Sequence, residues 1–146
     1  MKTARTEERK HALAKHLGIS VGKITPATWQ ARTFLADIDG PDTYRVLTDD
    51  EANAAVEEYI AETLWAFNAM FIEKQTGIAH RADILKLAQE TLCEGVNAAI
   101  LAMVQATCGL PAFVRAAVVA DGRGHFLACY DGDERESGEF FIYRLD

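Results

Sequence analysis

Apolar residues recur every three to four positions over much of the chain, which is the spacing of an amphipathic helix. The longest such pattern predicts a helix over residues 49–74. It begins at a capping box formed by Thr48 and Glu51, and Gly77 lies just beyond its end. Its apolar stripe consists of Ala52, Val56, Tyr59, Ile60, Leu64, Phe67 and Phe71.

The same period predicts further helices over residues 6–17, 81–93, 96–107 and 111–120. Gly95 lies between the second and third of these, so we expect either two helices there or one kinked helix. The aromatic residues of the central region, Trp65 included, are interpreted as core. If Trp65 is exposed, it marks a partner interface instead.

Short runs rich in β-branched and aromatic residues predict strands over residues 43–47, 125–130 and 139–145. The last two form an expected antiparallel hairpin with a long acidic loop. The strand at 43–47 is its expected third partner, because a lone hairpin is only marginally stable. Residues 18–42 hold several glycines and prolines and are expected to be irregular, apart from a short helical turn at 26–32.

These elements predict an α+β fold, with four to five helices packed on one face of a small, about three-stranded antiparallel sheet that ends in a C-terminal hairpin. With 146 residues, the chain is expected to form a single domain. Within it, residues 1–42 form a basic N-terminal helix and irregular arm, and residues 43–146 form an acidic body.

Composition narrows the class of protein further. No apolar run approaches the roughly 20 residues of a membrane-spanning helix, and the polar first residues do not resemble a signal peptide. The three cysteines, Cys93, Cys108 and Cys129, are widely spaced and do not form a disulfide framework. We therefore expect a cytoplasmic protein that does not act at a membrane.

Charge is distributed unevenly along the chain. Residues 1–32 carry seven basic and two acidic side chains, a net charge of +5, whereas residues 33–146 carry eight basic and twenty acidic ones, a net charge of −12. An acidic field of this kind repels nucleic acid and favours basic partners. The candidate partner-binding residues are Asp49, Asp50, Glu57, Glu58, Glu62, Asp131, Asp133, Glu134 and Glu136. The alternative interpretation of this charge is solubility.

A second hypothesis is a DNA-binding regulator. Residues 11–32 resemble a helix-turn-helix, in which a second helix would enter the major groove. That helix would have to contain Pro26, which removes an amide and costs about 3 kcal/mol in a helix interior.

The string from Asp121 to Gly132 offers a third hypothesis, a small-molecule binder or enzyme. Glycines flank Arg123, His125 follows, and Tyr130 lies beyond them, so these three side chains could line a pocket. The alternative is structural, with Arg123 paired to a nearby carboxylate. Neither CxxC nor HExxH occurs, so no metal or cofactor is expected.

The strings DGRGHFL, YDG and FIYR in residues 121–144, together with residues 44–52 and 64–68, resemble a group of small phage and mobile-element proteins with no assigned activity. The resemblance covers roughly residues 43–146. It implies an accessory protein that binds host defence machinery. Our leading hypothesis is a non-enzymatic inhibitor, of the anti-CRISPR or anti-restriction type, that occupies the basic surface of a host protein or ribonucleoprotein. A homo-oligomer is compatible with it.

Overall fold

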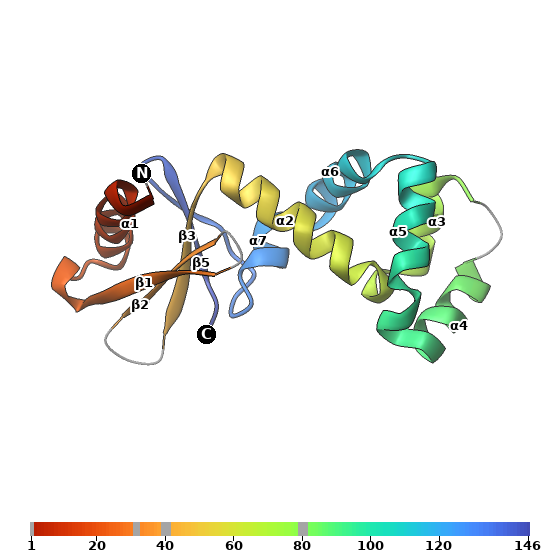
Figure 1. The fold of residues 1–146 in the computed structure, drawn as a ribbon, viewed down its shortest axis with the longest axis horizontal. Helices are drawn as coiled ribbons and strands as arrows, with labels where there is room; N and C mark the ends of the chain where they lie inside the picture. The colour runs from red at the N-terminus through yellow and green to blue at the C-terminus, as the bar shows by residue number, and fades with distance from the viewer. Residues whose placement is uncertain (1, 31–32, 39–41, 79–81) are drawn as a thin grey trace. The chain divides into compact units, whose positions relative to one another are not determined.

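The computed structural model describes residues 2–30, 33–38, 42–78 and 82–146 (Figure 1). For residues 2–4, 26–30 and 33–38 it describes the backbone alone. The chain divides into two compact units, the first made of Met1–Val56 and Gly122–Asp146 and the second of Glu57–Asp121. The predicted basic arm falls in the first unit, together with parts of the predicted acidic body.

The first unit is built on an antiparallel sheet that has five strands within the described residues. Neighbouring strands are hydrogen-bonded in the order β1 (Ile24–Gln30), β2 (Thr33–Ile38), β3 (Thr43–Thr48), β5 (Phe140–Arg144) and β4 (Arg135–Ser137). Together with the helices this confirms the α+β class, the antiparallel sheet and the C-terminal hairpin. The predicted pairing of the strand at 43–47 with the last strand is also confirmed, in the register Val46 opposite Ile142.

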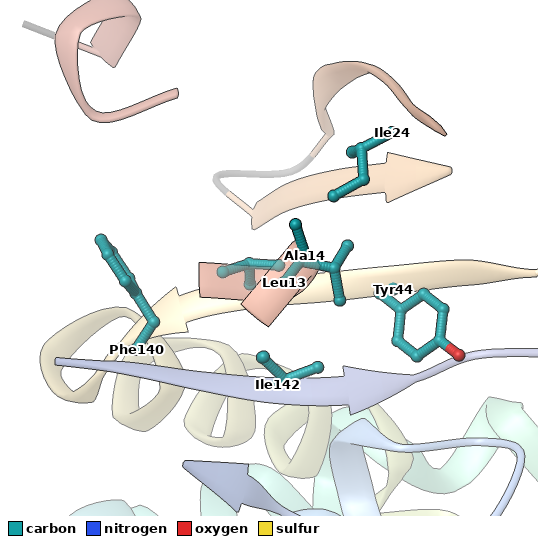
Figure 2. Packing of buried hydrophobic residues seen from close by; sticks show 7 residues of the cluster. Leu13, Ala14, Ile24, Tyr44, Phe140 and Ile142 are labelled. Atoms are coloured by element: carbon teal, nitrogen blue, oxygen red, sulfur yellow. The ribbon is translucent and has the colours of Figure 1, made fainter. Parts of the chain in front are cut away.

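Helix α1 (Lys2–Leu17) lies on one face of this sheet (Figure 1). Its apolar side packs against alternate residues of β3 and β5, which point to the same face. Figure 2 shows this cluster, which consists of Leu13, Ala14, Ile24, Tyr44, Val46, Phe140 and Ile142. The helix predicted over residues 6–17 is therefore confirmed, and it begins four residues earlier.

The intervening residues of β3 and β5 point to the opposite face of the sheet. Leu47 and Tyr143 are fully buried there, and the ring of Phe141 lies beneath the guanidinium of Arg123 from α7 (Arg123–Leu127). β3 and β5 thus bury side chains on both faces of the sheet, and their buried positions are all apolar or aromatic.

The prediction of an irregular segment at 18–42 with a helical turn at 26–32 is wrong. After a short 3₁₀ turn, η1 (Val21–Lys23), the chain forms the hairpin of β1 and β2. Pro26 is tolerated because β1 is an edge strand and its pairing register shifts between Thr25 and Thr28. The proposed helix-turn-helix geometry is wrong for the same reason, since its second helix would occupy β1.

The predicted strand at 125–130 is also wrong, because residues 123–127 form α7. Phe126, Leu127 and Ala128 are buried in succession, whereas one strand face would bury only alternate residues. The partner of β5 in the hairpin is instead β4, and the connection is the two-residue turn Gly138–Glu139 rather than a long loop.

The second unit is helical and begins within α2 (Asp49–Thr63), whose residues up to Val56 belong to the first unit. The predicted helix over 49–74 is interrupted: α2 ends in a 3₁₀ turn, η2 (Leu64–Ala66), and α3 (Ala69–Thr76) begins after it. The Asn68 side chain accepts hydrogen bonds from the amides of Met70 and Phe71, and this N-cap starts α3. The apolar periodicity continues from α2 into α3, so the sequence pattern does not reveal the break between them.

Helices α4 (Ala82–Leu92) and α5 (Asn97–Ala106) are separated by η3 (Cys93–Val96), and α6 (Leu110–Asp121) follows. These bounds confirm the predicted pair of helices and the predicted last helix. Phe113 of α6 is fully buried against the rings of Phe67 and Phe71. Trp65 is half-buried and Tyr59 is exposed, so the interpretation of Tyr59 as core is wrong.

Candidate functional site

Arg123 lies at the start of α7, directly after Gly122, whose φ of 85° is in the region that favours glycine. Its guanidinium donates to Glu134 at 2.8 Å, to Asp49 at 2.7 Å and to Asn53 at 2.9 Å. All these residues belong to the first unit. The predicted pairing of Arg123 with a nearby carboxylate is confirmed, and a second carboxylate from the start of α2 joins it.

The remaining faces of this network are occupied as well. The Arg123 guanidinium stacks 4.7 Å above the ring of Phe141, and the hydroxyl of Tyr143 donates to Glu134 at 2.5 Å. Burial alone would lower the pKa of Arg123, but its hydrogen bonds to Glu134 and Asp49 outweigh burial and raise that pKa. Burial, with the hydrogen bond to Glu134, raises the pKa of Tyr143. Arg123 therefore joins the start of α2 to the segment that contains Glu134, within the first unit.

The other two residues of the predicted pocket have different neighbours. His125 is exposed and its ring lies edge-on against Phe126. Tyr130 is exposed and its ring lies 3.8 Å beneath the guanidinium of Arg144. The contacts of Arg123, His125 and Tyr130 therefore anchor each side chain separately, and a shared ligand site stays a prediction.

The predicted acidic residues divide into two groups. Asp49 and Glu134 bind Arg123, Asp133 binds Arg135 at 2.8 Å, and Asp131 accepts the Asp133 amide in a local turn. The remaining members have no ion pair within the described part of the chain. They are Asp50, Glu57, Glu58, Glu62 and Glu136.

The acidic stripe, by which we mean Glu57, Glu58 and Glu62, follows from how α2 begins. The capping box forms as predicted: Glu51 accepts from the Thr48 amide at 3.0 Å, and Thr48 accepts from the Glu51 amide at 3.3 Å. This start fixes the phase of the helix, which buries Val56 and Ile60. The three carboxylates of the stripe are exposed as a result, all within the second unit.

The exposed apolar side chains of α4 are a surface that the periodicity does not reveal. Ile84 and Leu92 keep the helical period, yet both are exposed, and Gln89 is the buried residue of this helix. A stripe of apolar residues shows that a helix has two sides, but not which side faces the core. The one sequence feature that indicates an exposed apolar side on α4 is that its apolar positions extend over more than half of the helix circumference.

No group of three or more His, Cys, Asp or Glu side chains within the described residues is placed to hold a metal ion. No single helix there has the length and apolar character needed to cross a membrane; the segment Ala82–Ala106 taken with Leu110–Asp121, bent by 103°, has them by length and composition alone.

The chain matches no protein-family model, no curated protein and no solved structure. The function is therefore inferred from the fold and from the chemistry of the surface. The chain is an α+β protein in which Arg123 is bound by carboxylates of its own unit. The exposed carboxylates of Glu57, Glu58 and Glu62 lie on α2.

Proposed function

We propose that this chain is a non-enzymatic binding protein that uses the acidic stripe of α2 to occupy a basic surface of a partner. The observation that carries the proposal is the state of Glu57, Glu58 and Glu62. All three are exposed, and none forms an ion pair within the described residues. They are therefore available to a basic counterpart without first breaking an internal contact.

The stripe is electrostatically unfavourable in the isolated chain. Glu58 and Glu62 are four residues apart on one helix, so their charges repel. Glu62 also lies in the last turn of α2, where no basic residue is present and the helix dipole disfavours negative charge. A basic partner removes both penalties, which supports binding as the role of this surface.

The partner class follows from charge and from the resemblance described above. A surface that normally holds nucleic acid is rich in Lys and Arg, and a row of carboxylates can compete for it. The resemblance to phage and mobile-element proteins directs the first tests to host defence complexes, of the CRISPR or restriction type, that bind nucleic acid on such a surface.

The test compares two charge reversals of equal size. We expect the double variant Glu58→Lys/Glu62→Lys to bind such a complex more weakly, by roughly tenfold or more at low salt, because two charge pairs are replaced by repulsion. The matched control, Glu94→Lys/Asp121→Lys, changes two exposed carboxylates outside the stripe and should bind as the original chain does. Biolayer interferometry against the nucleic-acid-free complex measures both.

Two further readouts make the proposal refutable. Binding should weaken as salt rises, since exposed charges are screened, and it should be competed by the nucleic acid of the complex. Suppose that a complex binds the original chain, and that it binds the stripe variant and the control variant with equal affinity at low and at high salt. The stripe is then not the binding surface.

The stability of the chain offers an independent check that needs no partner. Glu62→Lys should raise the free energy of unfolding by about 1 kcal/mol, because it ends the repulsion with Glu58, creates a Glu–Lys pair at favourable spacing and complements the helix dipole. Thermal unfolding should shift upward by about 3 °C. Glu57→Lys, with no acidic residue one turn away on α2, serves as the control; equal shifts in both would contradict the argument.

A further inference from the structure

A groove of about 780 Å³ opens in the second unit. It is lined by the segment Trp65–Met70, which joins α2 to α3, and by residues of α4 together with Cys93 just beyond that helix. Its volume falls within the range of about 300–1,000 Å³ that is typical of ligand-binding clefts. We call it the Trp65 groove, and it is large enough to hold a long side chain with part of the backbone that carries it.

Gln89 supplies a hydrogen-bond acceptor to this groove. The residue lines the groove although only 7% of it is exposed. Its Nε2 donates to the carbonyl oxygens of Leu64 at 3.3 Å and Phe67 at 2.8 Å, which fixes the orientation of the side-chain amide. Its Oε1 accepts no hydrogen bond within the described residues, and it is not one of the enclosed side-chain atoms there that lack a partner. Oε1 therefore favours a ligand that brings a donor.

The charged side chains of the groove give it a net charge of −1. They are the carboxylates of Asp83 and Glu90 and the ammonium of Lys86. Lys86 lies 4.0 Å from Glu90, and both side chains are more than 60% exposed, so this pair is weak. Asp83 forms no ion pair in the part of the chain that the structure describes. An anion is disfavoured here, and an uncharged apolar ligand would leave Oε1 of Gln89 without a donor, whereas a cation that carries N–H donors suits both features.

The aromatic lining of the groove favours arginine among such cations. Trp65 is half-buried there, and a guanidinium stacks on an indole ring more readily than a strongly hydrated ammonium does. Its planar fork of donors can also serve Gln89 and a carboxylate together. The same combination already holds Arg123 in the first unit, where the guanidinium lies over the ring of Phe141 and donates to two carboxylates.

The groove opens close to the acidic stripe. Trp65 follows Glu62, the last member of the stripe, by three residues, and both belong to the second unit. The net charge of −7 disfavours a second copy of the chain as the source of an arginine. We propose that the Trp65 groove binds an arginine side chain of the basic partner. This proposal rests on the proposed function and deepens it: the stripe attracts a basic segment, and the groove selects the side chain that anchors it.

A titration followed by nuclear magnetic resonance tests the groove without a partner complex. The probe is the blocked peptide acetyl-Gly-Arg-Gly-Arg-Gly-amide. At about 1 mM peptide we expect the signals of the Trp65 indole N–H and of the Gln89 side-chain amide to shift. The same peptide with lysine in place of each arginine carries equal charge and should bind at least about fivefold more weakly. Equal affinity for the two peptides, or shifts confined to the acidic stripe, would overturn the proposal.

Two variants of equal net charge locate the site of peptide binding. Asp83→Asn/Glu90→Gln should weaken the binding of the arginine peptide by roughly tenfold, because it removes both carboxylates of the groove. The matched control, Glu94→Gln/Asp121→Asn, removes two exposed carboxylates that do not line the groove and should bind as the original chain does. Far-UV circular dichroism checks that both variants fold. Equal affinity of the two variants for the peptide would contradict the assignment.

A basic complex that binds the chain separates this proposal from the proposed function. We expect the groove variant Asp83→Asn/Glu90→Gln and the stripe variant Glu58→Lys/Glu62→Lys each to bind that complex roughly tenfold more weakly. If only the stripe variant binds more weakly, the acidic stripe is the binding surface and the groove proposal is wrong. If only the groove variant does, the groove binds the partner and the role proposed for the stripe is wrong.

Discussion

Replacing Gly124 with alanine is expected to destabilise the first unit by about 3 kcal/mol or more. An added Cβ would lie 2.5 Å from the carbonyl oxygen of Gly132 and 2.8 Å from backbone atoms of Asp133 and Glu134. Those atoms belong to the main chain and cannot swing aside as a flexible side chain can. The segment that carries Glu134 would have to move, and Arg123 would lose its best-placed carboxylate.

Urea unfolding of the variant measures this cost as a lower transition midpoint. Gly95→Ala is the matched control, because a Cβ there would lie no closer than 3.8 Å to its nearest neighbour, the Cβ of Leu92. It should leave stability unchanged or raise it slightly, since alanine favours helix. If the two variants unfolded at the same urea concentration, the close approach at Gly124 would be refuted.

The elements that could be predicted from sequence are those whose signals are local. The capping box at Thr48 and the glycine end of α3 at Gly77 both form, because each depends on residues within one turn. The α+β class could be predicted because several such signals agree. The break before α3 could not be predicted from the apolar stripe. The helical hydrogen bonding stops before Asn68, which caps α3, but the spacing of the apolar residues continues across the break.

The failed predictions share one physical cause. β1 contains Pro26, whose cost depends on whether the strand is at an edge, and that is decided by pairing with residues far along the chain. The predicted strand at 125–130 is an apolar run too short to distinguish a buried helix from a buried strand. Tertiary packing decided both cases.

The contacts of Arg123 in the candidate site show the same difference between local and distant partners. The pairing of Arg123 with a carboxylate of the following acidic segment could be anticipated from proximity in sequence, and Glu134 fills that role. The contact of Arg123 with Asp49, which lies 74 residues away in the chain, could not be anticipated in this way. Because Arg123 and Arg135 engage three of the nine predicted acidic residues, the surface available to a partner is smaller than the charge count suggests.

The second large effect is expected at the ion pair between Arg9 of α1 and Glu51 of α2. The guanidinium of Arg9 donates to Glu51 at 2.8 Å and to the carbonyl oxygen of Val46 at 2.8 Å, and it stacks over Phe140. The two side chains differ in burial, with 3% of Arg9 and 23% of Glu51 exposed. Glu51→Gln should cost about 3 kcal/mol, because the buried guanidinium of Arg9 loses the negative charge that now lies 2.8 Å from it.

The reverse substitution should cost less. Arg9→Met leaves Glu51 in contact with water and still hydrogen-bonded to Thr48, and it fills the buried space with an apolar side chain. The double variant should therefore be more stable than the sum of the single effects implies, by more than about 1 kcal/mol in a double-mutant cycle. Additive effects would show that the two groups do not interact.

Acid provides a reversible form of the same experiment. Burial alone would raise the pKa of Glu51, but the hydrogen bonds from Arg9 and Thr48 outweigh it and hold the pKa below its ordinary value of 4.5. A carboxyl with a lowered folded-state pKa contributes stability that is complete above pH 4.5 and is lost as pH falls through the lowered value. The free energy of unfolding should fall in the original chain between about pH 6 and about pH 3. It should fall less in Glu51→Gln, which has no carboxyl to protonate at this position.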